Sequence, residues 1–557
     1  MAETEKLKTL IVTDTSGKAK ALKKFLPKSY LVISTDGFLK NLPKSKIGVD
    51  ENFSPNYITV RGKGEILQEL KRISLKARKV FFAMNADGEG EFLANQCCEL
   101  FGVNEKSRCR LVIDEMTKTA VKNALNEARA VNQNLVAAFQ AKQIIDKVIS
   151  HKIGEYLSCK IYRGVKVGRF RAMLLRYVKL VSTAGLDGEF KFEKKFTPEV
   201  LQELALQNLK FSATKTQIVL DQLYEGLQFD KKDFAGLIKF PRGEEICLSS
   251  EKRTPDSVKE FLNKNQFELY DLIYRKITGG NFENQFELDG VCSEKSLMAT
   301  LETMQLDWAN VYSVGINSLV KRGYVAKVDG NFEVTELGEQ VLTALEKFFD
   351  DVFSVETYKK ISTQIDEISA GKIDKNSAIK NYLADFEKVF AEVWAELGEN
   401  PQPKDEPVIE SDEVCEKCGR KMLVKRGRFG RFLACSGYPE CKNTKPLMNY
   451  LPQKCPKCGG RLTKRTFKGG RIYFGCENFS TCDFGTWDEP QDKVCKVCGS
   501  TMFAHRFKDR VPMFYCGNEN CSTRENHPMN KILADTQKRY EEKKLRREKN
   551  KKVGTAT

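Results

Sequence analysis

The sequence predicts an α/β domain with a mainly parallel sheet, then mainly α domains with a winged-helix-like segment, and last three small β modules. Three observations predict this order. Short apolar runs alternate with helical patterns up to about residue 116. Helical periodicity dominates residues 116–180, 196–225, 255–275 and 293–398. Twelve cysteines recur in three sets of four after residue 413. A chain of 557 residues is also too long for one compact core, so several domains are expected.

The α/β domain is predicted from three short buried strands at residues 8–14, 30–35 and 79–84. The helical patterns KAKALKKFL and GEILQELKRIS lie between them. Strands that alternate with helices in this way favour a parallel sheet, because a parallel connection needs a crossover long enough to hold a helix.

The middle of the chain is predicted to be helical. Residues 308–342 (WANVYSVGINSLVKRGYVAKVDGNFEVTELGEQVL) are expected to form a helix, a turn, a two-stranded wing and another helix. Winged-helix DNA-binding domains have this outline, and helical domains of other kinds share it, so both interpretations stay open.

The clearest linker is ENPQPKDEPVIESDE at residues 399–413, which is rich in proline and acid. Three modules with a period near 40 residues follow it, and the chain ends in a basic tail. The predicted domains are 1–130 (α/β), 131–195 (helical), 196–280, 281–398 (helical, winged-helix-like), the linker 399–413, the modules 414–450, 451–490 and 491–530, and the tail 531–557.

Composition favours a water-soluble protein of the cytoplasm. Hydrophobic residues make up 41% and charged residues 30%, and no apolar run approaches the roughly 20 residues that cross a bilayer. The opening MAETEKLKTLIV lacks the layout of a secretory signal. These features predict a cytoplasmic location and no membrane partner.

The positive charge gathers in the last third of the chain. The formal net charge is +17; residues 401–557 hold 33 Lys and Arg against 19 Asp and Glu, a net of +14, which leaves +3 for the first 400 residues. This asymmetry favours a polyanion partner, with nucleic acid the usual candidate. A solvated basic surface explains the charge alone about equally well.

The cysteine spacing predicts zinc. Each of the three modules couples a C-x₂-C pair to a second pair after 16 or 17 intervening residues, and four thiolates on two tight turns satisfy tetrahedral Zn²⁺. Three closed, structural zinc ribbons are therefore expected, and a redox role is disfavoured because three matched repeats do not need one. The predicted ligands are Cys415, Cys418, Cys435, Cys441, Cys455, Cys458, Cys476, Cys482, Cys495, Cys498, Cys516 and Cys521.

The hairpins between the cysteine pairs interleave cations with aromatics, as in KRGRFGRFL (425–433). Aromatic rings can stack on unpaired bases while the cations hold phosphates, so single-stranded DNA is the expected partner. The alternative is that Phe432, Phe474 and Phe514 pack the ribbon cores. The predicted DNA contacts in the ribbons are Arg428, Phe429, Arg431, Arg471, Tyr473 and Arg506.

Three stretches of the N-terminal half resemble type IA DNA topoisomerases. LIVTDTSGKAK (10–20) is similar to the opening of that family, AMNADGEGEFLA (83–94) to its acidic Toprim motif Asp-x-Asp-x-Glu-Gly-Glu, and GLIKFPR (236–242) to the segment with the nucleophilic tyrosine. The first ribbon resembles the C-terminal ribbons of the family. Supporting matches are FSPNYITVRGK (53–63), DEMTKTAV (114–121), QAKQIIDKVISHKIG (140–154), VGRFRA (167–172) and LGEQVL (337–342).

The resemblance implies a Toprim domain, DNA as partner, and a transesterification. In the family a tyrosine attacks a single-stranded phosphodiester and forms a phosphotyrosine, a second strand passes through the gap, and Mg²⁺ on the Toprim acids stabilises the developing charge. It also implies DNA contacts for Lys142, Arg169 and Arg171, and a location with the nucleoid.

The chemistry-bearing positions depart from this pattern. The tyrosine position is Phe240, which has no hydroxyl, the opening Glu position is Asp14, and the leading Asp of the acidic motif is Asn85. An Asn carbonyl ligates Mg²⁺ only weakly beside a carboxylate, so Mg²⁺ binding is expected to be weakened. The family's positions are retained at Lys18, Asp87, Glu89, Glu91, Arg169 and Arg242.

Two readings stay open for the acidic motif. Asp87, Glu89, Glu91 and Asn85 hold Mg²⁺, or they form a solvated strand-to-helix turn whose acids are stabilised by the helix dipole. The β-rich arch that frames the strand-passage hole of the family is also missing, because only about 20 residues separate Tyr177 from Phe196 and the later return is equally short.

Three hypotheses follow. The first is a topoisomerase-like protein that binds DNA without cleaving it. The second is an active type IA enzyme with a displaced tyrosine, for which Tyr224, Tyr270, Tyr274 and Tyr312 are the candidates. The third is a Toprim nuclease or primase, which Asn85 disfavours because two-metal chemistry needs its carboxylates.

Overall fold

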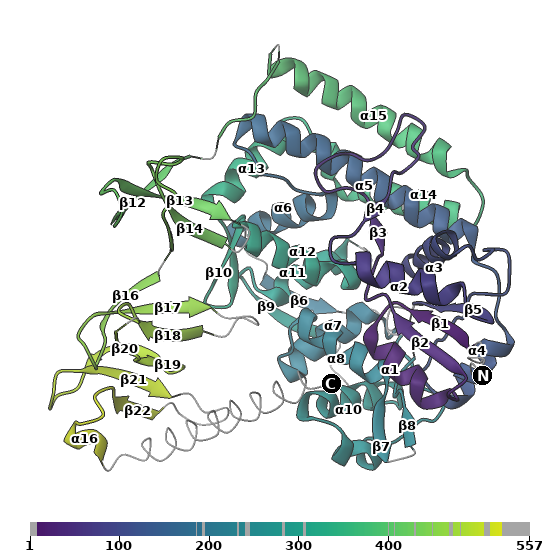
Figure 1. Ribbon diagram of the computed structural model, residues 1–557, viewed down its shortest axis with the longest axis horizontal. Coiled ribbons are helices and arrows are strands. Elements are labelled where there is room, and N and C mark those ends of the chain that lie inside the picture. Colours follow the sequence, from purple (N-terminus) through teal and green to yellow (C-terminus); the bar gives the residue numbers. More distant parts are fainter. Residues whose placement is uncertain are drawn as a thin grey trace, which may run out of the picture. The chain divides into compact units, whose positions relative to one another are not determined.

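The computed structural model describes residues 8–525 except 185–186, 192–194, 231–232, 240–244, 281–284, 305–307, 399, 406, 428–429, 448, 467–471, 480 and 506–512. Phe240, Arg242, Arg428, Phe429, Arg471, Arg506 and the tail 531–557 therefore lie outside the described residues, as does the side chain of Arg431. The chain divides into two compact units, Met1–Glu406 and Pro407–Thr557 (Figure 1).

The first unit begins with the expected α/β domain. Strands β1 (Thr9–Thr13), β2 (Tyr30–Ser34) and β5 (Lys79–Ala83) form a parallel sheet in the order β2-β1-β5 (Figure 1). The crossovers carry α1 (Ser16–Phe25) and α2 (Gly64–Ser74), and a short strand pair, β3 (Lys40–Asn41) with β4 (Ile58–Thr59), lies between them. The three predicted strands and their parallel arrangement are confirmed.

Helix α3 (Gly88–Phe101) follows β5 directly, and α4 (Lys118–Asn126) comes after an extended segment. The turn before α3 carries the acidic motif. Because the carboxyl ends of parallel strands meet at one edge of the sheet, the turns after β1 and β5 lie side by side there.

The helical middle is built around α5 (Gln133–Lys160), which packs on α3, α14 (Val355–Ser369) and α15 (Lys375–Glu396). Its apolar residues occur on several faces, as suits a helix covered on most sides. Helix α6 (Arg169–Ala184) shares the same core cluster.

A second helical group packs against the α/β domain. It comprises α7 (Pro198–Leu209), α8 (Ala213–Glu225), the strand pair β7 (Leu227–Asp230) and β8 (Asp233–Ala235), α9 (Pro255–Val258) with the 3₁₀ turn η1 (Lys259–Phe261), and α10 (Lys264–Ile277). Buried apolar residues of this group and of the sheet, such as Ile11, Leu204 and Leu223, belong to one core cluster. The helical group and the parallel sheet therefore share a hydrophobic interior.

The short segments at the place of the arch form one two-stranded ribbon. Strand β6 (Asp187–Lys191) pairs antiparallel with β9 (Gln285–Asp289), with Asp187 opposite Asp289. After it come α11 (Glu294–Thr303), α12 (Ala309–Arg322), β10 (Val325–Val328), β11 (Asn331–Val334), α13 (Glu336–Glu346) and the 3₁₀ turn η2 (Asp351–Phe353). The predicted order of helix, two-stranded wing and helix is present at residues 309–346.

The second unit consists of antiparallel ribbons. Ribbon 1 has β12 (Ile409–Val414), β13 (Lys421–Gly427), β14 (Gly430–Cys435) and β15 (Thr444–Pro446); ribbon 2 has β16 (Asn449–Lys454), β17 (Arg461–Thr466), β18 (Ile472–Cys476) and β19 (Gly485–Thr486); ribbon 3 has β20 (Glu489–Val494), β21 (Thr501–His505), β22 (Met513–Cys516) and α16 (Ser522–Glu525).

Ribbons 2 and 3 share a core. Phe503 and Tyr515 of ribbon 3 belong to one buried cluster with Leu462 and Cys482 of ribbon 2, and the Thr501 hydroxyl donates to the Lys454 carbonyl at 2.7 Å. Ribbon 1 has a separate small core. The α/β, helical and ribbon parts of the predicted fold class are thus confirmed. Among the helices that the structure describes, none has the length and apolar character needed to span a membrane.

Candidate functional site

Each ribbon gathers its four cysteine thiols at one point. In each set the four Sγ atoms lie within 4.8 Å of one another. In ribbon 1 the Sγ–Sγ distance is 3.6 Å between Cys415 and Cys441 and 3.2 Å between Cys418 and Cys435, and ribbons 2 and 3 have the same pairing with 3.3 to 3.8 Å.

The backbone around the thiols suits thiolate charge. The Gly437 N–H donates to Cys435 Sγ and the Asn478 N–H to Cys476 Sγ, both at 3.3 Å. The glycine after each C-x₂-C pair has a positive φ (68° at Gly419, 73° at Gly459, 68° at Gly499), which lets the chain turn back tightly at the metal. Four soft ligands at this spacing fit Zn²⁺, so the three predicted structural zinc sites are confirmed.

The ribbons expose aromatic side chains, one of them beside a cation. Trp487 is 46% exposed and contacts Tyr473 edge-on at 4.9 Å between ring centroids, while Phe479 is 59% exposed with the Arg465 guanidinium 4.8 Å from its ring. Of the phenylalanines expected to be either core or surface, Phe474 is buried and Phe514 is 46% exposed. Trp487 and Phe479 were missed from sequence because they lie outside the cation-rich hairpins.

At the edge of the parallel sheet, Lys18 is paired inside the protein. Its Nζ lies 2.9 and 3.0 Å from the two carboxylate oxygens of Asp14 and donates to the Asn85 side-chain carbonyl. The Asn85 backbone N–H donates to Asp14 Oδ2 at 3.0 Å. Lys18 is only 3% exposed, and burial lowers the pKa of its ammonium, although Asp14 opposes that change.

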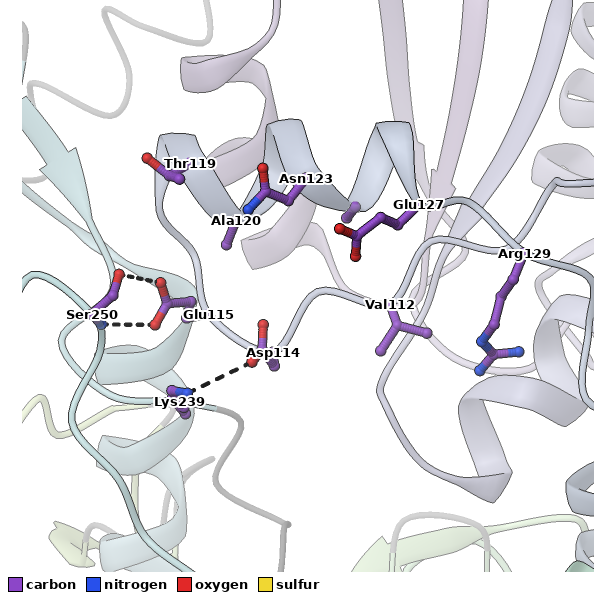
Figure 2. A pocket seen from close by; sticks show the side chains of 11 residues that line it. Val112, Asp114, Glu115, Thr119, Ala120, Asn123, Glu127, Arg129, Lys239 and Ser250 are labelled. Atoms are coloured by element: carbon purple, nitrogen blue, oxygen red, sulfur yellow. Dashed lines mark hydrogen bonds and ion pairs between the residues drawn. The ribbon is translucent and has the colours of Figure 1, made fainter.

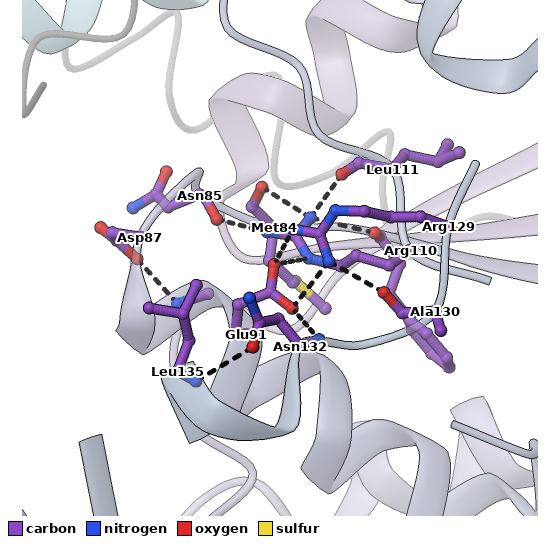
Figure 3. Close-up of polar contacts among 12 residues, drawn as sticks. Met84, Asn85, Asp87, Glu91, Arg110, Leu111, Arg129, Ala130, Asn132 and Leu135 are labelled. Carbon is purple, nitrogen blue, oxygen red and sulfur yellow. Dashed lines mark hydrogen bonds and ion pairs between the residues drawn. The ribbon is translucent and has the colours of Figure 1, made fainter. Parts of the chain in front are cut away.

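Glu91 belongs to an ion-pair network with Arg110 and Arg129 (Figure 3). Its carboxylate accepts from Arg110 Nε at 2.8 Å, from Arg129 at 2.7 Å and from the Asn132 N–H at 2.9 Å. Arg110 is fully buried and also donates to the carbonyls of Met84 and Asn85. Burial raises the pKa of Glu91, but Arg110, Arg129 and Asn132 outweigh burial and hold it below its ordinary value.

The other two acids of the motif belong to the start of α3. Asp87 Oδ1 accepts from the Gly90 N–H at 2.7 Å, which caps the helix (Figure 3). Glu89 is exposed and lines a cavity of about 420 Å³ together with Asp14, Asn85 and Glu225.

The described residues do not fit a Mg²⁺ site in this arrangement. Mg²⁺ is usually held by one or two carboxylates and keeps several waters. Here Asp14 and Glu91 are paired with protein cations, and Asp87 caps a helix. Within the part of the chain that the structure describes, the cysteine sets are the only groups of three or more His, Cys, Asp or Glu ligand atoms lying within 4.8 Å of one another.

The residues beside position 240 contact the α/β domain. Lys239 forms a β-bridge with Glu115, and its Nζ lies 4.0 Å from Asp114 Oδ2. The Ser250 N–H donates to Glu115 Oε2 at 2.8 Å, and its hydroxyl donates to Oε1. Figure 2 shows these groups on one side of a polar cavity of about 490 Å³, with Arg129 on the other.

The tyrosines weighed as displaced nucleophiles are mostly buried. The Tyr224 hydroxyl donates to the Ile113 carbonyl at 2.6 Å, and the Tyr270 hydroxyl to the Arg253 carbonyl at 2.5 Å. Tyr312 is fully buried and Tyr274 is half-buried. Burial raises the pKa of Tyr224, Tyr270 and Tyr312, which opposes formation of a phenolate.

The predicted DNA-contacting cations of α5 and α6 lie in different settings. Arg169 is buried with its Nε 2.7 Å from Asp146 Oδ1 and its guanidinium over the Tyr358 ring. Arg171 is half-buried, and Lys142 is exposed. The role of these three side chains in DNA binding stays a prediction.

Comparisons with known proteins agree with this architecture. Residues 9–116 match the model of the Toprim domain, residues 283–380 match a DNA topoisomerase model, and residues 412–450 and 452–491 match the topoisomerase DNA-binding C4 zinc finger. A solved structure of full-length topoisomerase I from Thermotoga maritima is similar over 83% of this chain and 100% of its own, with 20% identity and a TM-score of 0.59. That structural similarity concerns the fold.

Proposed function

Because the chain belongs to the type IA DNA topoisomerase family, we propose that it binds DNA, preferentially single-stranded, and does not cleave and rejoin it. Phe240 carries this proposal. The family's covalent step needs a phenol oxygen at that position, and a phenylalanine ring offers no atom that can attack phosphorus. The proposal also places the protein in the cytoplasm, associated with the nucleoid.

The surroundings of position 240 support the absence of cleavage. The adjoining Lys239 is held against Glu115, so residue 240 follows directly after a contact with the α/β domain. The hydroxyls of Tyr224 and Tyr270 each donate a hydrogen bond to a backbone carbonyl, which leaves them poorly placed to attack a phosphodiester. The two-stranded ribbon β6–β9 is also far smaller than an arch that frames a passing strand.

The ribbons support the binding half of the proposal. Exposed aromatics, of which Phe479 has the Arg465 guanidinium beside it, suit the stacking of unpaired bases, and the net charge of +14 over residues 401–557 suits phosphate contact. Base stacking needs an open ring face, which paired bases do not offer, so single strands are favoured.

Negatively supercoiled plasmid with Mg²⁺ provides the test. After denaturation, the expected result is intact supercoiled DNA with no protein attached, while a labelled single-stranded oligonucleotide is bound in a parallel titration. Relaxed plasmid or a covalent adduct would instead support a displaced tyrosine. Nicking without an adduct would support a Toprim nuclease.

A further inference from the structure

The sheet edge that carries the acidic motif already holds a cation, the ammonium of Lys18. Three oxygens surround Lys18 Nζ: both carboxylate oxygens of Asp14 and the side-chain oxygen of Asn85. Nζ donates hydrogen bonds to Asp14 Oδ2 and Asn85 Oδ1, while Asp14 Oδ1 lies 2.9 Å from Nζ and has no hydrogen-bond partner among the described residues. These oxygens come from the turns after β1 and β5, which the parallel sheet brings together.

Asn85 contributes hydrogen bonds to this cluster and adds no charge to it. Its backbone N–H donates to Asp14 Oδ2 at 3.0 Å while its side-chain carbonyl accepts from Lys18. One carboxylate and one ammonium then balance within the buried cluster. A carboxylate at position 85 would add a negative charge that Lys18 alone does not neutralise, which is a condition that favours a divalent cation.

The arginines beside the cluster oppose a second cation, while the acids Asp36, Glu89 and Glu225, which line the cavity at this sheet edge, favour one. Glu91 is paired with both Arg110 and Arg129, so this network carries one excess positive charge next to the Lys18 cluster. The Arg110 guanidinium lies close enough to lower the pKa of Lys18 further. A divalent ion at Asp14 would have to displace a buried ammonium from its carboxylate and leave that ammonium unpaired.

We propose that Lys18 takes the place of a divalent cation at this centre, and that Asn85 is the residue that makes the centre independent of metal. This inference goes beyond the proposed function, because it concerns the acidic motif and is tested without DNA.

Binding of Mn²⁺ to the zinc-loaded full chain, followed by electron paramagnetic resonance, tests the proposal. Mn²⁺ prefers carboxylate oxygens and competes poorly for the thiolate sites. The wild-type chain is expected to show no specific Mn²⁺ site in the millimolar range. N85D keeps Lys18 and adds one carboxylate, and it is expected to bind Mn²⁺ at least about tenfold more tightly than the wild type.

A second variant removes the internal cation. K18M leaves Asp14 buried and unpaired, so its melting temperature is expected to fall in NaCl and to recover in MgCl₂ of equal ionic strength. The matched control is K20M, which removes an exposed lysine of the same helix and is expected to melt at the same temperature in both salts.

Two outcomes would overturn the proposal. One is a specific Mn²⁺ site in the wild-type chain that E89Q abolishes, because the acidic motif would then hold a metal beside Lys18. The other is N85D binding Mn²⁺ no more tightly than the wild type, because Asn85 would then not be the cause.

Discussion

The hydroxyl of Tyr224 donates a hydrogen bond of 2.6 Å to the backbone carbonyl of Ile113, and so joins helix α8 to the segment that follows the parallel sheet. Tyr224 is 3% exposed, and its ring lies 5.8 Å from Lys18 Nζ. The Thr15 hydroxyl adds a second link to the same helix by donating to Glu225 at 2.7 Å. This tyrosine therefore fastens helix α8 to the segment that follows the parallel sheet.

The first prediction concerns this contact. Y224F is expected to lower the free energy of unfolding by about 1 to 2 kcal/mol, because the Ile113 carbonyl loses its donor in a buried setting. DNA binding is expected to stay unchanged. Urea unfolding measures the first effect and oligonucleotide titration the second, with Y274F as the control at a half-buried tyrosine. A DNA adduct in the wild type that Y224F abolishes would contradict the structural role.

Zinc removal is expected to unfold ribbons 2 and 3 together. They share the cluster of Leu462, Cys482, Phe503 and Tyr515, so C498S in ribbon 3 should also expose ribbon 2 to trypsin. C418S in ribbon 1 should leave both protected, because ribbon 1 has its own core. Metal analysis should give three zinc ions per wild-type chain. Fewer than two zinc ions per chain would contradict the zinc sites. Equal protection of ribbon 2 in C498S and C418S would contradict the shared core of ribbons 2 and 3.

Trp487 is expected to stack on DNA bases. W487A should weaken binding of a single-stranded oligonucleotide by about tenfold, in line with the loss of one stacked base. Fluorescence anisotropy measures the affinity, and F261A is the control because Phe261 is an equally exposed aromatic outside the ribbons. Equal losses in the two variants would show that Trp487 has no special role.

The affinity is also expected to fall steeply as salt concentration rises, since the release of ions from phosphates drives such contacts. A titration series at increasing NaCl measures the slope. A flat dependence would exclude the basic ribbons as the main DNA-binding surface.

The Glu91 network is expected to stabilise the first unit above mildly acidic pH. The folded-state pKa of Glu91 lies below the value of about 4.3 for an unfolded chain, so its contribution is complete above that pH and is lost as pH falls through the folded pKa. E91Q leaves Arg110 buried without its charged partner and should cost about 3 kcal/mol at pH 7. E89Q, at an exposed position, should cost less than about 0.5 kcal/mol.

Unfolding followed between pH 7 and pH 3 provides the measurement for both variants. The wild-type stability should fall toward the stability of E91Q at the acidic end. Parallel curves for the two proteins would contradict the ion-pair account.

The pKa of Glu203 is shifted upward, in the direction opposite to that of Glu91. Neither of its carboxylate oxygens has a hydrogen-bond partner among the described residues, and burial raises its pKa to about 9, helped by Glu302 and Glu199. Because the folded pKa is higher than the unfolded value of about 4.3, stability is expected to fall as pH rises between these values. E203Q should raise the free energy of unfolding at pH 8 by about 2 kcal/mol.

Unfolding curves at pH 5 and pH 8 check this prediction, since the gain from E203Q should be larger at pH 8. The control is E260Q, at an exposed glutamate of the η1 turn that does not contribute to the pKa of Glu203. A gain that does not depend on pH would show that Glu203 does not titrate as proposed.

Local patterns in the sequence predicted most of the fold. The strands at 9–13, 30–34 and 79–83 follow from short apolar runs, and the zinc ligands follow from cysteine spacing, because both signals lie within a few neighbouring residues. The domain boundaries remain predictions, although the division between the two units falls inside the proline-rich segment 399–413.

The sequence by itself also determined that residue 240 has no hydroxyl, since that is a matter of covalent structure. Only the tertiary structure decided which partners the charged side chains contact. Lys18 pairs with Asn85 across 67 residues, and Glu91 pairs with Arg129 across 38. The acidic motif alone does not tell whether its carboxylates face solvent or an arginine, because burial and charge pairing arise from contacts between distant segments. For the same reason, the sequence alone does not tell that Phe474 is buried and Phe514 exposed.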